Sequence, residues 1–294
     1  MQLDLFLDSR AVVLANEIAA AVLVCDGPAA VAALNEARLK GLDHPALPAL
    51  ETLASALVEW RPPARNVQAL AAAVDRLDNS VVPAAQSVLG QQAPAFVAHF
   101  FGPLSELARD LPYDPLHPSA SRASLLLRCG DFEGAGEAVL AISDWRRAPD
   151  ALRWLTLARY RARGLDAARG SLFAFAWLRP MDVGQLLSEL ADDMLDRDWR
   201  AFEAASDWES IPAGELAAWF PAWYLVEHPA TAASLDPEVS VEAAPAVAAR
   251  TILHLLELER QGNSRALAAS RARLRTLNAD LFAVYMARRR VLHG

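Results

Sequence analysis

The chain has 294 residues, of which 54% are hydrophobic and 22% charged, and its formal net charge is −8. The charged share excludes a wholly disordered protein, and the negative balance argues against a general nucleic-acid coat. Alanine is the commonest residue type, with 61 copies, whereas aromatic residues make up only 7%. Because alanine favours helices and sheets need more β-branched and aromatic side chains, the composition predicts an all-α fold.

The N-terminus and the cysteines indicate a reducing compartment. Asp4 and Asp8 stand where a secretory signal carries lysine or arginine, so export is not expected. The most apolar early stretch, residues 11–24, is interrupted by polar side chains and is too short to span a bilayer. Cys25 and Cys129 are too few for a disulfide framework. We therefore expect a cytoplasmic protein without a membrane span.

A short motif follows Met1 and consists of Gln2, Leu3, Asp4, Leu5 and Phe6. It resembles the peptide by which bacterial replication and repair proteins dock on the sliding clamp, whose pattern is Gln-Leu, then Ser or Asp, then Leu-Phe. Such a peptide places its leucine and phenylalanine in an apolar pocket while the glutamine amide makes polar contacts. The resemblance implies that these five residues bind a sliding clamp.

Two interpretations of this segment stay open. Asp8 or Ser9 fits the N-cap of a helix that begins near Arg10, which leaves residues 2–7 outside the helix and free to bind a partner. In the other interpretation, the apolar side chains of this segment cover the exposed end of the first helical repeat.

Turn signals recur along the chain in two interleaved series. Successive signals of the first series are on average about 34 residues apart, the spacing of helical-hairpin repeats. They lie at residues 26–28, 61–63, 93–94, 130–131, 164–166, 198, 228–229 and 262–263. The second series lies at residues 41–45, 78–80, 110–119, 143–145, 179–180, 207–212, 235–237 and 278–279.

The segments between these turns have the apolar spacing of amphipathic helices. Leu125, Leu126 and Cys129 precede one turn, and Ala135 and Val139 follow it, at helical spacing. Because one helix pair cannot bury its apolar face alone, stacking of neighbouring pairs is expected. The sequence therefore predicts an all-α fold, an α-solenoid of stacked antiparallel helix pairs with roughly 14 to 16 helices.

Part of the chain resembles the tetratricopeptide repeat. Residues 130–135 match the glycine, acid, aromatic and later alanine at the turn between the two helices of that repeat. Trp154, Leu157 and Ala158 resemble the start of its first helix. The match covers about two repeats within residues 121–180. The resemblance implies a tetratricopeptide-like fold whose concave face holds partner proteins.

The domain organisation follows from the same signals. We expect an N-terminal peptide at residues 1–7 and a single helical-repeat domain at residues 8–294. The segment 111–119 holds three prolines, each of which disfavours helix in the residue before it, and it is the best candidate for a boundary between two lobes. The alternative is a longer loop inside one superhelix.

Aromatic residues gather in the C-terminal half. Seven of the eight tryptophans lie within residues 143–226. The densest group contains Trp219, Trp223 and Tyr224, residue types that are enriched where proteins bind partners. We expect these three to line a partner-binding groove, with packing in the core as the alternative.

The C-terminal end is basic. Residues 260–294 contain eight arginines and one acid, Asp280, a formal charge of +7. Guanidinium groups bind phosphates and carboxylates, so contact with nucleic acid or an acidic partner is expected; a solvated helix face is the alternative. The candidate contacts with an anionic partner are Arg271, Arg273, Arg275, Arg288, Arg289 and Arg290.

Catalytic, cofactor-binding and metal-binding patterns are not found in the sequence. His254 and Glu257 lie one helical turn apart, but a metal needs three or four ligands and no second pair accompanies them. We therefore expect no enzyme activity and no cofactor. The expected function is a protein-binding scaffold, tethered to the bacterial sliding clamp through residues 2–6. The alternatives are a DNA replication or repair accessory factor with a DNA-contacting C-terminal end, and an unrecognised enzyme.

Overall fold

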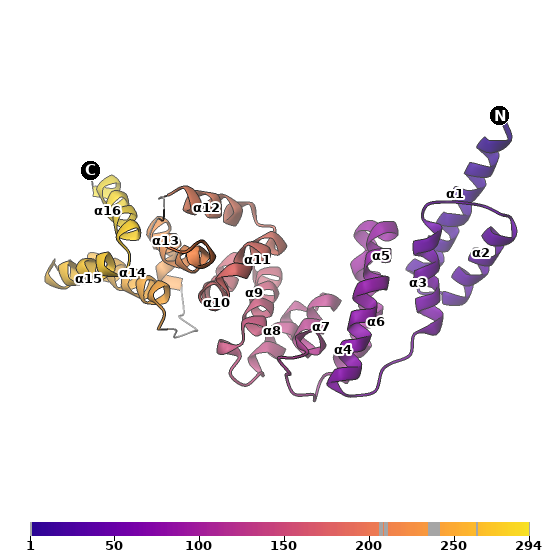
Figure 1. The fold of residues 1–294 in the computed structure, drawn as a ribbon, viewed down its shortest axis with the longest axis horizontal. Coiled ribbons are helices and arrows are strands. Elements are labelled where there is room, and N and C mark those ends of the chain that lie inside the picture. Colours follow the sequence, from indigo (N-terminus) through magenta and orange to yellow (C-terminus); the bar gives the residue numbers. More distant parts are fainter. Residues whose placement is uncertain (1, 206–207, 209–210, 235–241, 263, 294) are drawn as a thin grey trace. The chain divides into compact units, whose positions relative to one another are not determined.

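The computed structural model describes residues 2–205, 208, 211–234, 242–262 and 264–293. These residues form helices and loops, and none of them lies in a strand. The predicted all-α class is therefore confirmed. The chain divides into two compact units, unit 1 (Met1–Ala138) and unit 2 (Val139–Gly294), whose helices are labelled in Figure 1.

Unit 1 is built from helices α1 to α7 and most of α8. Their bounds are α1 (Gln2–Leu23), α2 (Gly27–Leu39), α3 (Leu47–Glu59), α4 (Val67–Arg76), α5 (Val82–Leu89), α6 (Ala93–Leu107), α7 (Arg122–Cys129) and α8 (Phe132–Leu140). A π-helical segment, η1 (Leu77–Val81), joins α4 to α5, and 3₁₀ turns at η2 (Gly90–Gln92) and η3 (Pro118–Ala120) precede α6 and α7. Helices adjacent in sequence pack on each other, as α1 does on α2 and α6 on α7.

Local sequence signals set the starts of these helices. The carboxylate of Asp26 accepts a hydrogen bond from Ala29 N at 3.0 Å, and the side chain of Asn66 accepts one from Ala69 N at 2.8 Å. Each bond satisfies a backbone donor that the first helical turn leaves without a partner. Proline occupies the first turn of α2, α3, α5 and α6, where its missing N–H is not needed.

The core of unit 1 is mainly aliphatic. Leu53, Leu70 and Leu104 are fully buried, together with Phe100. Trp60 packs edge-on against Phe100, with ring centroids 5.3 Å apart. Each of these side chains removes a large apolar area from water, which is the main force that holds the helices together.

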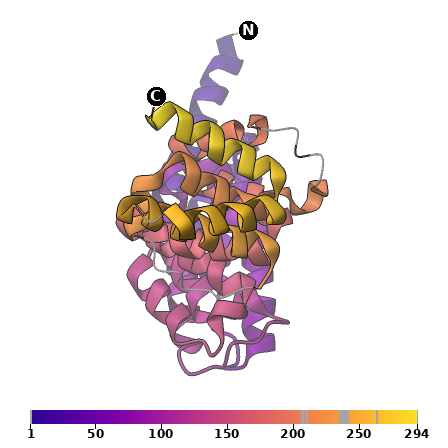
Figure 2. The same cartoon turned by 90° about the vertical axis from the view of Figure 1, so that its left-hand side faces the viewer.

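Unit 2 contains the remaining helices. Their bounds are α9 (Pro149–Arg163), α10 (Leu165–Leu178), α11 (Val183–Leu190), α12 (Asp193–Ala204), α13 (Phe220–Glu227), α14 (Ala244–Gln261), α15 (Ser264–Leu277) and α16 (Ala279–His293). Short 3₁₀ segments lie at η4 (Trp145–Arg147), η5 (Pro180–Asp182), η6 (Ala213–Trp219) and η7 (Pro229–Ser234). In Figure 2 the C-terminal helices face the viewer, and α15 and α16 lie side by side.

Most of the predicted turns separate helices in the structure. Gly130 ends α7 with a φ of 76°, and the Asp131 carboxylate accepts a hydrogen bond from Gly134 N at 2.9 Å at the start of α8. The turns confirmed between elements lie at residues 26, 41–45, 61–63, 110–119, 130–131, 143–145, 164, 179–180, 228–229, 262 and 278. The predicted turns at 207–212 and 235–237 lie partly or wholly outside the described residues.

The predicted turn at residues 93–94 falls on the first residues of α6, and η2 separates α5 from α6 instead. Two other predicted turns are wrong, and their polar residues have partners elsewhere in the fold. Residues 78–80 lie in η1, where helix continues from α4 to α5; Asp78 forms an ion pair with Arg128 of α7. Asp198 lies inside α12, with its carboxylate 3.1 Å from Nε2 of His228. The chain also folds into its two units with the division between Ala138 and Val139, within α8, while residues 111–119 lie inside unit 1.

Candidate functional site

The motif at residues 2–6 belongs to the first turns of α1. Helix α1 begins at Gln2, so the expectation of a helix start near Arg10 is wrong. Neither proline nor glycine occurs between Gln2 and Leu23, and Asp8 and Ser9 lower helix propensity too little to stop the helix. In Figure 1 these first turns extend beyond α2 and α3. The side chains of residues 2–9, which include Gln2, Leu3, Asp4, Leu5 and Phe6, lie outside the described part of the structure.

The aromatic group of unit 2 lies in the core. Trp219, Trp223 and Tyr224 are only 6%, 3% and 4% exposed, and residues 220–226 of α13 are all buried. Phe220 stacks on Trp223 with centroids 6.0 Å apart. These residues therefore do not line an exposed groove, and the expectation of partner contact through them is corrected to the core-packing alternative. The physical reason is that α13 contacts α10, α12, α14 and α16.

The six candidate arginines fall into two groups. Arg271, Arg288 and Arg289 form ion pairs inside unit 2, with Glu227 or Glu259. Arg273, Arg275 and Arg290 are exposed and form no ion pair with another described residue. Residues two apart on a helix do not face the same way, so Arg273 and Arg275 do not form one continuous patch on α15. The basic charge of the C-terminal end is therefore partly neutralised.

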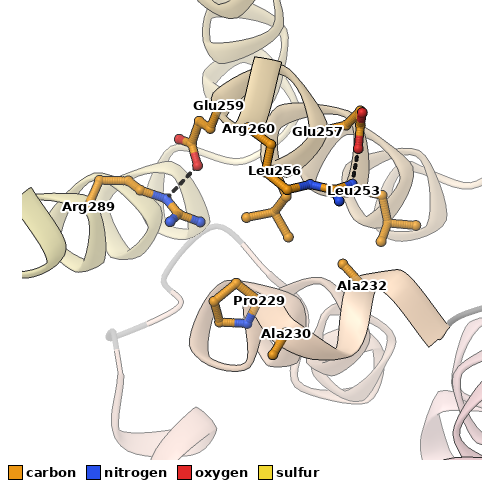
Figure 3. Close-up of a pocket in the computed structure, with 9 residues that line it drawn as sticks. All are labelled: Pro229, Ala230, Ala232, Leu253, Leu256, Glu257, Glu259, Arg260 and Arg289. Atoms are coloured by element: carbon orange, nitrogen blue, oxygen red, sulfur yellow. Dashed lines mark hydrogen bonds and ion pairs between the residues drawn. The ribbon is translucent and has the colours of Figure 1, made fainter. Parts of the chain in front are cut away.

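A pocket of about 540 Å³ opens in unit 2 between η7, α14 and α16 (Figure 3). Its apolar lining comes from Pro229, Ala230 and Ala232 on η7 and from Leu253 and Leu256 on α14. Its charged lining comes from Glu257, Glu259 and Arg260 on α14 and from Arg289 on α16. The volume of this pocket is within the range of small-molecule sites.

Polar side chains from three helices meet at one edge of the pocket, and we call Glu259, Arg271, Tyr285 and Arg289 the Glu259 cluster. The Tyr285 hydroxyl donates a hydrogen bond to Oε1 of Glu259, and Arg271 Nη2 lies 3.5 Å from the same oxygen. Arg289 Nε lies 3.1 Å from Oε2. Arg271 Nε donates to the Tyr285 hydroxyl at 3.3 Å. One carboxylate therefore organises groups from α14, α15 and α16.

The cluster keeps Tyr285 in its neutral form. Tyr285 is fully buried, and this burial raises the pKa of its hydroxyl; the hydrogen bond to Glu259 raises it further. The hydrogen bond with Tyr285 raises the pKa of Arg271, so the guanidinium stays charged. Both Arg271 and Arg289 also lie over the Tyr285 ring, 5.7 and 5.3 Å from its centroid. These contacts fix the positions of both guanidinium groups.

Two donor nitrogens of Arg289 lack hydrogen-bond partners within the cluster. The residue is only 8% exposed, and its buried Nε and Nη2 atoms make no hydrogen bond with any described residue. Its Nε is close to Glu259, but the N–H does not point along that line, so the contact is an ion pair without an aligned hydrogen bond. A buried donor left in this condition costs about 1–3 kcal/mol.

Sequence reasoning found Arg271 and Arg289 but missed Glu259, Tyr285 and the pocket. The helical spacing of α14 contained one usable signal: Glu259 continues the stripe of Ile252, Leu255 and Leu256, all buried. An acid at such a position predicts a partner inside the fold. That its partners come from α15 and α16 depends on how these helices pack.

Metal binding and thiol chemistry find little support in the geometry of the described residues. Among the described residues, no three His, Cys, Asp or Glu side chains are grouped to hold a metal ion. Burial raises the pKa of the thiols of Cys25 and Cys129, which disfavours the reactive thiolate. Within the same part of the chain, no helix combines the length and apolar character needed to cross a membrane.

Comparisons of the chain with protein-family models, with curated proteins and with solved structures give no match.

Proposed function

We propose that the chain is a non-catalytic protein-binding scaffold, tethered to the bacterial sliding clamp through Gln2, Leu3, Asp4, Leu5 and Phe6. The observation that carries the proposal is the position of this motif, in the first turns of α1, which extend beyond α2 and α3 (Figure 1). In this proposal the partner binds the motif at this end of α1. The residues match every position of the clamp-binding pattern.

The helical start of α1 is compatible with binding in an extended form. Terminal helical turns that lack neighbours open at little cost in free energy, because their stability comes mainly from packing. Once the turn opens, Leu5 and Phe6 enter the apolar pocket of the clamp and supply most of the binding energy. Ordering the peptide on the clamp lowers the affinity, as it does for other segments that fold on binding.

We propose further that the helix pairs stack as an α-solenoid that resembles tetratricopeptide repeats. The hairpin at Gly130 and Asp131 supports this arrangement, as does the single-residue connection at Gly164 between α9 and α10. Because Trp219, Trp223 and Tyr224 are buried, a client protein contacts other residues on the surface of the scaffold.

The test is calorimetric titration of a bacterial sliding clamp with the full chain and with the double variant Leu5→Ala, Phe6→Ala. We expect saturable binding by the full chain and a loss of at least 100-fold in the variant, since both anchors are removed. The matched control is Val12→Ala, Val13→Ala, because these residues of the same helix are 45% and 54% exposed. Equal binding by all three proteins, or no binding by the full chain, contradicts the proposal.

A DNA accessory role is the second candidate, and the exposed Arg273, Arg275 and Arg290 favour it. If each of the three contacts one phosphate, the slope of log K against log salt is about −3, and Arg273→Gln with Arg275→Gln reduces it to about −1. If the chain binds no DNA at any salt concentration, this candidate is contradicted and the clamp proposal is unaffected.

A further inference from the structure

We propose that the pocket between η7, α14 and α16 binds an organic carboxylate with an apolar chain, such as a medium-chain aliphatic acid. The site has a charged end, formed by Arg289, and an apolar body, formed by Pro229, Leu253 and Leu256 (Figure 3). This binding goes beyond the scaffold function and does not depend on it.

The first argument is charge balance. The Glu259 cluster holds two guanidinium groups, Arg271 and Arg289, against the single carboxylate of Glu259, while burial keeps Tyr285 neutral. Arg260 and Glu257 pair with each other at the outer edge of the pocket and add no net charge. The cluster therefore has one surplus positive charge. The Arg271 side chain is 32% exposed and does not line the pocket, whereas the Arg289 side chain is 10% exposed and lines it, so a monoanion that compensates the surplus binds at Arg289.

The second argument is the unsatisfied donor. Arg289 lines the pocket and is only 8% exposed. Its Nη2 has no hydrogen-bond partner among the described residues. Figure 3 shows its guanidinium between Glu259 and the space above Pro229. A ligand oxygen in that space accepts from Arg289 in a charge-assisted hydrogen bond.

The third argument identifies the anion as a carboxylate rather than a phosphate. Glu257 and Glu259 both line the pocket, so a dianion meets two like charges there, whereas one surplus guanidinium matches one carboxylate. The alanines and the proline of η7, with Leu253 and Leu256, offer no polar side chain to the rest of the ligand. An aliphatic chain fits this lining.

The test uses octanoate as the probe, with isothermal calorimetry and thermal melting of the full chain. We expect saturable binding and a melting temperature that rises with octanoate concentration. Octanol, which has the same chain without the charge, and inorganic phosphate, which has charge without a chain, are expected to bind at least tenfold more weakly. No saturable octanoate binding, equal binding of octanol, or displacement of octanoate by equimolar phosphate overturns the proposal.

Variants locate the site. Arg289→Gln is expected to weaken octanoate binding by about 10- to 100-fold, since it removes a hydrogen bond to a charged group. Its matched control is Arg290→Gln, the exposed neighbour on the same helix, which leaves binding unchanged. Because Arg289 also pairs with Glu259, a second variant, Leu253→Glu, repels the carboxylate while leaving the Glu259 cluster intact. Full binding by either Arg289→Gln or Leu253→Glu overturns the proposal.

The Leu5→Ala, Phe6→Ala variant is expected to bind octanoate normally. A failure of clamp binding is therefore distinguishable from a failure of carboxylate binding.

Discussion

Glu259 shows how one side chain connects three helices. Its carboxylate is 16% exposed and receives Tyr285 and Arg289 from α16 and Arg271 from α15. Ion pairs of this kind add little stability when both partners are present, but removing one partner leaves the others buried without compensation. Glu257, two residues away, forms an exposed pair with Arg260 on its own helix. The two glutamates therefore form a natural comparison.

Glu259→Gln is expected to lower the free energy of unfolding by about 3 kcal/mol, since two guanidinium groups then share a buried place without a counter-charge. Glu257→Gln is expected to change it by less than about 0.5 kcal/mol, because exposed ion pairs contribute little. Urea denaturation of both variants measures the difference. Similar losses in the two variants contradict the assignment of Glu259 as the organising carboxylate.

Tyr285 gives the cluster a signature at high pH. The pKa of its hydroxyl is raised above 10 in the folded protein, mainly by burial, so the folded state holds this proton more tightly than the unfolded chain. The contribution of Tyr285 to stability is therefore complete below pH 10 and decreases as the pH rises from 10 towards the folded pKa. We expect the free energy of unfolding to fall with pH in that range.

The variant Tyr285→Phe is expected to show a shallower fall above pH 10 than the unmodified chain. Tyr160 and Tyr224 also have raised pKa values, so part of the slope persists in the variant. Denaturant unfolding at several pH values between 8 and about 11 measures both slopes. Parallel curves for the two proteins contradict a raised pKa at Tyr285.

At the scale of single elements, two glycines have opposite roles. Gly130 ends α7 with a φ of 76°, a conformation that side chains rarely adopt, although nothing lies within 4 Å of an added Cβ. Gly184 lies inside α11, also with open space around it and without a positive φ, and no proline follows it. Backbone conformation alone therefore distinguishes the two positions.

Gly130→Ala is expected to lower the free energy of unfolding by about 1 kcal/mol, because alanine in the left-handed region is strained. Gly184→Ala is expected to raise it by roughly 0.5 kcal/mol, because alanine restricts the unfolded chain and favours helix. Thermal unfolding of each variant gives the sign. A loss of stability at Gly184 or none at Gly130 contradicts the described helix boundaries.

Local chemistry explains which elements the sequence could predict. Gly130, Asp131 and Gly164 define turns through their own backbone preferences and caps, so the helices beside them were predictable. Asp78 and Asp198 have turn-forming side chains, but Asp78 pairs with Arg128 and Asp198 lies against His228, both from distant parts of the chain. Information about these partners is not available within a short window of sequence.

The candidate site was less predictable for the same reason. Arg271 and Arg289 were visible as part of a basic segment, but their pairing with Glu259 depends on the packing of α15 and α16 against neighbouring helices. Trp219 and Trp223 were visible as an aromatic cluster, and only the packing around α13 shows that they are core residues. The residue types therefore indicated which interactions were possible, and only the burial of each side chain showed whether it packs in the core or faces a partner.

At the scale of the whole molecule, the two proposed binding activities belong to different units. The proposed clamp-binding motif lies in unit 1, and the pocket proposed to bind a carboxylate lies in unit 2. No described residue takes part in both sites, so mutations in the two sites are expected to act additively. The Arg289→Gln variant is expected to bind the clamp as tightly as the unmodified chain does. The Leu5→Ala, Phe6→Ala variant is expected to bind octanoate as tightly as the unmodified chain does. Reduced binding in either crossed measurement contradicts independence.

The most direct measurement of the scaffold proposal is hydrogen exchange of the full chain with and without a bacterial sliding clamp. The proposal requires the first turns of α1 to open in the free chain, so their amides are expected to exchange quickly. Addition of the clamp is expected to slow exchange in residues 2–7 while the rest of unit 1 and all of unit 2 keep their rates. Unchanged exchange in residues 2–7 at a saturating clamp concentration, or protection confined to other segments, contradicts the account.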